Sequence, residues 1–478
     1  MKQTFMLFLL FTGLLSNVVS QNDTCNCLEN FNLTLEKTEA NYAGFPDKVT
    51  AQTRPAYQAM VTNLQKKAAK ETDPKRCFSL ISTYVTFFKD RHFDVALSLH
   101  NEGDKVFSKL TESDYRKSLQ KNPARGIEGI WTNPDSSVSI AVQNNGKDNY
   151  QAVVIKSTVK ETPIGLVYAN LTKTPEGYSF TKYNFMTAAY PARLHGGLLR
   201  LWNIELWGKV FPGQMTLGEQ TELTTWRNYN FGLQFKMLDQ KTAYLKIPTF
   251  SRDNLVQKLI ADNDASIKKA SYLIVDLRGN GGGNTGWSYL LPYFMTRPID
   301  QGESYLRLSA DNIKRNLAEM EPVVKNPVSD EMKKYFTPAY MLTLLRAYEE
   351  IPVSKEVYYP IPSITIPLDS VAKFPKKIAL IFDDLCGSSA EYFFHISRQS
   401  DKITRYGDRT FGMMDYLGMP QRTALPFKDY HLVIPDTKSS WTDKAPIDQT
   451  GFIPEVDLSV LPQWKWVDFV KNDLSKHK

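Results

Sequence analysis

The 478-residue sequence has four cysteines, six histidines and no long block of basic residues. The cysteines form a single Cys-x-Cys with no second pair, a spacing that does not fit a zinc site, so we expect no metal. The formal charge of +7 is spread along the chain, and without a basic patch to grip a phosphate backbone we expect no nucleic-acid partner. Past residue 20, no segment reaches the roughly 20 apolar residues of a membrane-spanning helix, so we expect none in the mature chain.

The N-terminus has the layout of a secretory signal peptide. Lys2 precedes an apolar run over residues 5–15, and small residues follow up to Ser20. This pattern predicts that residues 1–20 are cleaved after Ser20. The mature protein is then expected to be periplasmic or extracellular.

Three cysteines lie in the first 80 residues of the chain, at Cys25, Cys27 and Cys77. Disulfides form in the oxidising compartments that exported proteins reach. We therefore expect a bridge from either Cys25 or Cys27 to Cys77, and the sequence leaves the choice open.

The pattern of apolar residues changes near residue 123. Residues 21–122 have helix-like apolar spacing and form a predicted N-terminal helical region. In residues 123–216, apolar and polar residues alternate around the turn signals Asn145-Gly146 and Pro175-Glu176-Gly177. This alternation predicts a small inserted antiparallel module, either a barrel or a sandwich.

Residues 217–478 alternate strand-like and helix-like segments, which predicts an α/β core with helices covering a sheet. Within them, residues 303–360 are charged and helical and are interpreted as an insertion or cap. An apolar strand precedes each of two motifs described below, the glycine run and the serine pair.

The glycine run DLRGNGGGNTG contains Gly281, Gly283 and Gly286 in the order of a dinucleotide-binding G-x-G-x-x-G. That reading is disfavoured because polar residues separate the strand from the glycines, and no acidic residue ends a second strand about 20 residues later. A glycine-rich loop also lets backbone amides approach a ligand closely, as an oxyanion-binding site requires.

Ser388 lies between an apolar strand and a predicted helix, and two interpretations stay open. With Glu391 three residues later it fits a capping box, in which its hydroxyl satisfies a helix amide. At the same place a nucleophile gains from the positive end of the helix and its first-turn amides. A nucleophile needs a base. Among the six histidines we choose His92 as the candidate, because the acidic residues Asp90 and Asp94 flank it and could orient or stabilise its imidazole.

Together these residues resemble the C-terminal processing (tail-specific) serine peptidases and their tricorn-core relatives, of the exported bacterial type without an evident PDZ domain. The matching elements follow the family order, and they are Asp90-Arg91-His92, the glycine run from Asp276 to Gly283, Ser388-Ser389-Ala390-Glu391, Gly407 to Gly412, and Gly451 with Pro454-Glu455. The resemblance implies a crotonase-like or ClpP-like α/β core and a peptide or protein substrate.

The resemblance also implies site roles. Ser388 becomes the nucleophile, and the amide of Ser389 with that of Gly281 or Gly282 forms the oxyanion hole. The Ser-Lys branch of the family has a lysine at the position of Met413, so here the base is assigned to His92 as in the tricorn-like branch.

Asp448, ahead of Gly451, is the predicted supporting carboxylate. The predicted function is that of an exported serine endopeptidase without a cofactor. The alternatives are a catalytically inactive peptidase scaffold that binds peptides or glycans, and a carbohydrate or lipid binder that uses the β module.

Overall fold

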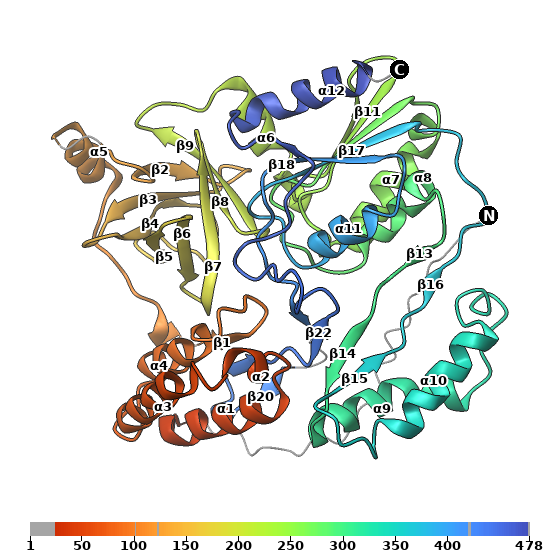
Figure 1. The fold of residues 1–478 in the computed structure, drawn as a ribbon. Coiled ribbons are helices and arrows are strands. Elements are labelled where there is room, and N and C mark those ends of the chain that lie inside the picture. The colour runs from red at the N-terminus through yellow and green to blue at the C-terminus, as the bar shows by residue number, and fades with distance from the viewer. Residues whose placement is uncertain (1–23, 101, 122–123, 419–421, 477–478) are drawn as a thin grey trace.

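The computed structural model describes residues 24–100, 102–121, 124–418 and 422–476 (Figure 1). The predicted signal peptide, residues 1–20, lies outside the described residues. In the described part of the chain, none of the helices is long and apolar enough to cross a membrane.

The N-terminal part is helical except for one strand. Its elements are α1 (Cys27–Asn41), α2 (Phe45–Lys48), α3 (Arg54–Ala68), α4 (Pro74–Thr86), β1 (Asp94–Ser98), the short 3-10 helix η1 (Glu102–Asp104) and α5 (Glu112–Lys121). The sequence prediction of helix throughout this part is wrong for β1, which pairs antiparallel with β7 and β21. These partners lie far along the chain, so the pairing was not visible in the local apolar pattern.

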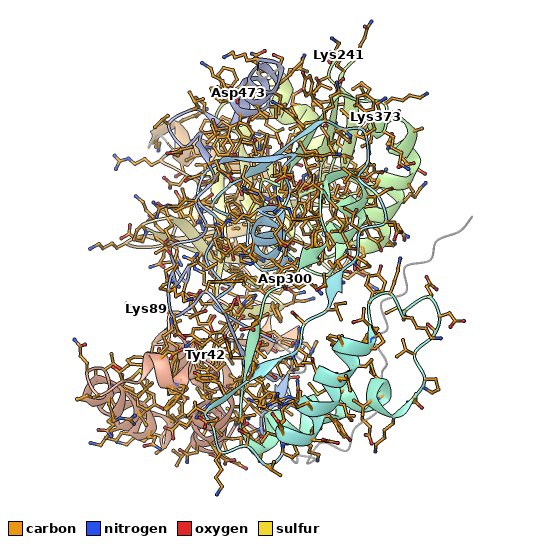
Figure 2. All side chains as sticks on the ribbon, turned by 45° about the vertical axis from the view of Figure 1, so that its right-hand side comes forward. Tyr42, Lys89, Lys241, Asp300, Lys373 and Asp473 are labelled. Atoms are coloured by element: carbon orange, nitrogen blue, oxygen red, sulfur yellow. A yellow bond between two sulfur atoms is a disulfide. The ribbon has the colours of Figure 1, made fainter. Side chains whose placement is uncertain are left out.

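Aromatic packing holds these helices together and joins them to the C-terminal half. Tyr42, labelled in Figure 2, is fully buried, and its ring stacks on Phe93 with centroids 4.8 Å apart. The same core contains Tyr416 and Tyr430 from the other end of the chain. The disulfide is Cys27–Cys77, which links α1 to α4, while Cys25 is a buried free thiol.

Eight strands form a closed antiparallel ring to the left of Figure 1. They are β2 (Gly129–Thr132), β3 (Val138–Asn144), β4 (Asn149–Ser157), β5 (Val167–Thr174), β6 (Gly177–Lys182), β7 (Phe185–His195), β8 (Leu198–Leu201) and β9 (Glu205–Phe211). Each strand pairs with the next, and β9 pairs back with β2. The pairing therefore has the closed form of a barrel, one of the two predicted forms. β7 pairs with β6 along one edge, and along its other edge it pairs with both β8 and β1. From β1, the strands β21 (Tyr430–Val433) and β20 (Thr423–Ala424) extend the sheet.

The second large sheet has the order β10-β11-β12-β17-β18-β23 and is parallel from β11 onward. Its strands are β10 (Gln234–Met237), β11 (Thr242–Lys246), β12 (Tyr272–Asp276), β17 (Lys377–Phe382), β18 (Ile403–Gly407) and β23 (Val456–Asp457). Alternate strand residues pack on opposite faces, so Val275 contacts one helix layer and Ile274 the other.

Helices cover both faces of this sheet (Figure 1). One layer holds α7 (Asp253–Ile267), η3 (Gly286–Leu290), α8 (Leu291–Phe294) and α11 (Ser389–Ser397), and the other holds α12 (Trp466–Lys476). The short elements α6 (Leu217–Thr224) and η2 (Arg227–Tyr229) precede the sheet, and η4 (Gln463–Lys465) precedes α12. The predicted α/β architecture is confirmed. The parallel strands end on one edge, where loops after β12, β17 and β18 meet, the usual place for a ligand site.

Residues 303–360 form a helical arm at the lower right of Figure 1. The arm comprises β14 (Ser304–Arg307), α9 (Ala310–Lys325), α10 (Pro338–Glu350) and β15 (Tyr358–Ile361). Its strands join β19 (Tyr416–Leu417) and β22 (Thr437–Ser439) in a four-stranded sheet, and β13 (Ile299–Asp300) pairs with β16 (Thr365–Ile366) nearby.

Replacing Cys77 by serine should lower the free energy of unfolding by about 2–4 kcal/mol, because the disulfide closes a loop with a sequence separation of 50. Urea unfolding under non-reducing conditions measures this loss. Cys25→Ser is the matched control, since that thiol is unpaired, and it should cost less than about 1 kcal/mol. Equal losses for the two variants would contradict the assigned pairing.

Candidate active site

Ser388 lies on a sharp turn between β17 and α11. Its backbone has φ 52° and ψ −123°, a left-handed conformation that is strained for a residue with a side chain. As the N-cap of α11 it makes no side-chain capping bond, so the capping-box interpretation is wrong. The turn leaves the hydroxyl free for another partner.

The Glu391 side chain, the other half of the expected capping box, is fully buried and binds elsewhere. It accepts hydrogen bonds from the Thr410 hydroxyl at 2.6 Å and from the amides of Gly412 and Met413 at 2.7 and 3.0 Å. Burial raises its pKa to about 7. Glu391 therefore anchors the loop after β18 to the first turn of α11.

The partner of the Ser388 hydroxyl is His92. The Ser388 Oγ lies 3.1 Å from His92 Nε2, although 296 positions separate the two residues. On the other side of the ring, Nδ1 lies 2.8 Å from the carbonyl oxygen of Tyr416. Because a carbonyl can only accept, we assign the proton to Nδ1, which leaves the Nε2 lone pair facing the serine hydroxyl.

The loop before β1 holds the histidine in place. Asp90 Oδ1 accepts the His92 amide hydrogen at 2.8 Å, and Asp90 Oδ2 accepts the Tyr42 hydroxyl at 2.8 Å. The predicted flanking residue Asp94 points elsewhere and accepts the Ala188 amide at 3.0 Å. Of the two flanking acids, Asp90 is thus the one that orients the His92 segment, and it acts through the backbone.

His92 is 4% exposed. Burial disfavours the charged imidazolium and lowers the pKa of His92 to about 4. The imidazole is therefore neutral at physiological pH, the state in which Nε2 accepts a proton.

The structure does not bring Asp448 onto the histidine ring. Asp448 Oδ2 instead accepts Lys48 Nζ at 3.0 Å, and burial together with the nearby Asp90 raises the pKa of Asp448 to about 8. The prediction that Asp448 is the supporting carboxylate of His92 is wrong, because the Tyr416 carbonyl accepts the hydrogen bond from Nδ1. No sequence signal marks a backbone carbonyl for this role.

The glycine loop packs directly on the serine turn. A Cβ added at Gly282 would lie 2.7 Å from the Ser388 Cβ and 2.8 Å from the Ser389 nitrogen, so only glycine fits there. The Gly282 amide donates to Asn280 Oδ1 at 2.9 Å, and the Gly281 amide donates to the Gly279 carbonyl at 3.1 Å.

Of the three predicted oxyanion-hole amides, two are thus already engaged. The Ser389 amide is different because it lies in the first turn of α11, where helix amides have no acceptor within the helix.

Two further bonds tie the glycine loop to the serine turn. The Gly387 amide donates to the Asn280 carbonyl at 3.0 Å, and the Gly279 amide donates to Asp383 Oδ1 at 2.8 Å. Met413, at the position of the lysine in the Ser-Lys branch, packs its sulfur near Gly387. Sequence reasoning did not assign Asn280 or Asp383 to the site.

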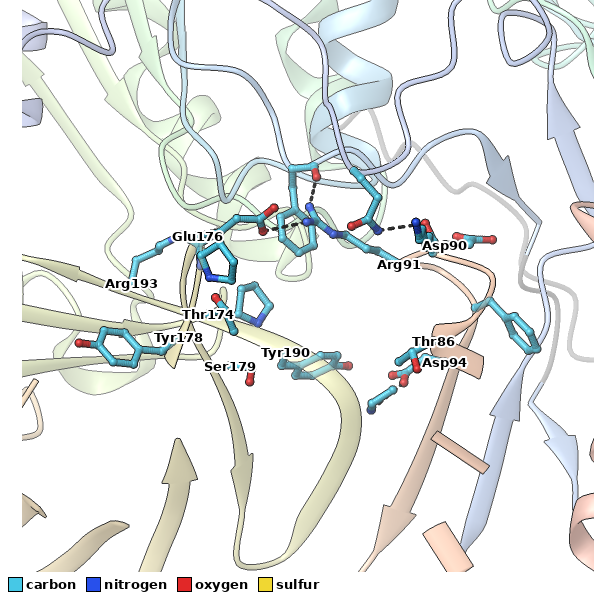
Figure 3. A pocket seen from close by; sticks show the side chains of 17 residues that line it. Thr86, Asp90, Arg91, Asp94, Thr174, Glu176, Tyr178, Ser179, Tyr190 and Arg193 are labelled. Carbon is cyan, nitrogen blue, oxygen red and sulfur yellow. Dashed lines mark hydrogen bonds and ion pairs between the residues drawn. The ribbon is translucent and has the colours of Figure 1, made fainter. Parts of the chain in front are cut away.

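A cavity of about 340 Å³ lies next to the His92 segment, between the β5–β6 turn and β7 (Figure 3). Its lining carries both charges, including Asp90, Arg91, Glu176 and Arg193. Arg91 spans the cavity wall, since it donates to Glu176 Oε2 at 2.9 Å and to the carbonyl of Phe411.

Comparison with known proteins gives a family for the α/β region. Residues 241–454 match the model of peptidase family S41. The crystal structure of mature CPAF has a TM-score of 0.51 at 14% identity, covering 93% of this chain and 95% of that chain. Mature CPAF complexed with lactacystin gives 0.50 at 12%, covering 94% and 97%. A putative peptidase from Parabacteroides merdae ATCC 43184 gives 0.46 at 12%, covering 94% and 97%. At these identities the two CPAF structures show a shared fold. No curated protein matches the chain.

The strained turn makes a prediction about stability. Ser388→Gly should unfold at a higher temperature than Ser388→Ala, because glycine adopts φ 52° without the strain of about 1–3 kcal/mol that alanine keeps. At the helical neighbour the order should reverse, with Ser389→Ala more stable than Ser389→Gly by about 1 kcal/mol. Differential scanning calorimetry of the four variants tests both. A Ser388→Gly variant no more stable than Ser388→Ala would contradict the strain.

Proposed function

Because the chain is a serine-type peptidase of family S41, we propose that it hydrolyses peptide bonds with Ser388 as nucleophile and His92 as general base. The family resemblance predicted from the sequence is confirmed, and the family acts on peptide or protein substrates. The observation that carries the proposal is the 3.1 Å contact between Ser388 Oγ and His92 Nε2, with Nδ1 bound to the Tyr416 carbonyl.

The proposed reaction proceeds through an acyl-enzyme. The Ser388 oxygen attacks the substrate carbonyl carbon while His92 Nε2 takes the hydroxyl proton. The imidazolium then gives this proton to the leaving amine as the peptide C–N bond breaks. A water molecule then attacks the ester carbonyl carbon while His92 Nε2 takes its proton, and the imidazolium gives this proton to the Ser388 oxygen as the ester C–O bond breaks. The Tyr416 carbonyl keeps the ring in the orientation that both steps need.

The oxyanion that forms during attack needs amide donors. We assign the Ser389 amide as one donor because it is free of helix partners and adjoins the nucleophile. The Gly282 amide is the second donor in this proposal, after it exchanges the Asn280 oxygen for the substrate oxyanion. Gly281 is the alternative second donor and would release the Gly279 carbonyl in the same way.

Several finer predictions enter the proposal unchanged. We propose that the protein is exported after cleavage of residues 1–20, that its α/β core is of the crotonase or ClpP type, and that residues 21–122, 123–216 and 217–478 are its domains. N-terminal sequencing of the protein recovered outside the cytoplasm tests export. Cleavage after Ser20 is the expected result.

The inactive-scaffold alternative rests on the loss of the family lysine at Met413. The contact between His92 and Ser388 favours the active enzyme, because it supplies a neutral base at the position where the reaction needs one.

Ser388→Ala and His92→Ala should each lower kcat/KM for peptide hydrolysis by about 10³-fold or more, because each removes an indispensable partner in proton transfer and attack. Labelling by a fluorophosphonate probe should disappear in Ser388→Ala. The exposed His100 provides the control, and His100→Ala should keep the activity of the parent protein. Full turnover in correctly folded His92→Ala would contradict the assigned base.

The low pKa of His92 predicts a displaced acid limb in the pH profile. Protonation of His92 removes the base, so kcat/KM should fall only as the pH approaches about 4, rather than near the pKa of about 6.5 of an exposed histidine. Initial rates in overlapping buffers measure the profile. An acid limb centred at pH 6.5 or above would show that the base is not the buried, neutral imidazole of His92.

A further inference from the structure

The antiparallel ring contacts the catalytic loops at several places, among them β7, where Arg193 donates to Asp384, and the turn that follows β8. This turn, between β8 and β9, carries Trp202, which is 7% exposed and has φ 49°. A bulky residue is rarely held at positive φ, and where it is, the surrounding structure must impose the conformation.

The indole lies against both glycine-containing loops of the site. A Cβ added at Gly281 would lie 2.6 Å from the Trp202 ring, and one added at Gly387 would lie 3.3 Å from it. Gly281 belongs to the glycine loop, and Gly387 directly precedes Ser388. The Trp202 indole therefore fills the space beside these two glycines, which have no side chains of their own.

Arg200, two residues earlier, supports the same loop. Its Nε donates to the Trp202 carbonyl at 3.1 Å, and its Nη2 donates to the Gly279 carbonyl at 3.1 Å. The guanidinium is buried and lies over the Trp226 ring at 4.9 Å. Arg200 thus fixes the backbone of the turn and the start of the glycine loop at once.

The contact continues on the other side of the ring. The Trp202 and Phe411 rings have centroids 4.8 Å apart, and the Arg91 guanidinium lies 3.7 Å from the Phe411 centroid. Phe411, Met413 and Leu385 belong to the same hydrophobic core as the ring strands. The core of the ring and the catalytic loops are therefore one packed unit.

We propose that Trp202, held by Arg200, is a positioning residue for the reaction. Its indole fixes the glycine loop relative to the Ser388 turn, so that the oxyanion amides and the hydroxyl keep their mutual geometry. The indole contacts each loop at a glycine, the residue with the greatest backbone freedom. In this proposal the eight-stranded antiparallel ring completes the active site through Trp202. The proposal rests on the proposed peptidase function.

The kinetic test compares Trp202→Ala and Trp202→Phe with the parent protein on a peptide substrate. We expect kcat to fall by about 10²-fold or more in Trp202→Ala with KM changed less than about threefold, since loop placement affects the transition state. Trp202→Phe should recover at least tenfold of the loss. The control is Trp207→Phe, a buried tryptophan of the same ring that packs on Tyr168, which should keep kcat within about threefold.

A double-mutant cycle tests the contact itself. Gly281→Ala places a methyl group against the indole and should lower kcat, while Trp202→Phe added to it should restore part of that loss. Strictly additive effects would overturn the proposed contact. So would a Trp202→Ala enzyme with kcat within threefold of the parent.

Amide hydrogen exchange gives a readout that does not need activity. In a Ser388→Ala background, Trp202→Ala should raise exchange over residues 277–290 and 383–390 and leave residues 138–157 of the ring unchanged. If the parent protein fails to hydrolyse peptides, the proposed function falls, and the exchange pattern still decides the role of Trp202. Exchange raised equally in all three segments, or in none, would overturn it. If Trp202→Ala does not fold, the same comparison is made with Trp202→Phe.

Discussion

The hydrogen bond from His92 Nδ1 to the Tyr416 carbonyl is the interaction on which the site depends. It fixes the tautomer and turns the other ring nitrogen toward Ser388. Because His92 precedes β1 and Tyr416 lies in β19, the bond exists only when the N-terminal helices pack on the C-terminal half of the chain. The shared aromatic core around Tyr42 and Tyr416 supplies that packing. The active site therefore forms only when the N-terminal region is folded against the C-terminal half of the chain.

Three buried carboxyl groups in this region bind backbone amides, hydroxyl groups or a cation. Asp90 holds the His92 amide, Glu391 holds the loop at Gly412 and Met413, and Asp448 pairs with Lys48. Burial raises the pKa of all three. The imidazole itself is hydrogen-bonded to a neutral carbonyl and a neutral hydroxyl. Desolvation is therefore the main cause of the lowered pKa of His92.

The sequence predicted those features that depend on local patterns. Alternation of strands and helices gave the α/β layers, and turn signals such as Asn145-Gly146 marked the hairpins of the ring. The pairing of Ser388 with His92 followed from family resemblance, since nothing local relates two residues 296 positions apart. The strand β1, the Tyr416 carbonyl and the partner of Asp448 were missed because each is decided by a distant segment. The predicted capping box is absent because the Glu391 side chain accepts hydrogen bonds from the loop after β18 instead.

The strand β7 belongs to two structures at once. Along one edge its first residues, 185–187, pair with β1, and its last residues, 192–195, pair with β8. The pairing of β7 with β8 thus closes the eight-stranded circuit along only part of β7, and β1 of the N-terminal region pairs with the first residues of the strand. A fragment cut at residues 123 and 216 would expose a bare row of backbone donors and acceptors at 185–187, a template for adding a strand from a neighbouring molecule. The circuit is self-contained in its pairing order, but the cover of this edge comes from β1 in the N-terminal region.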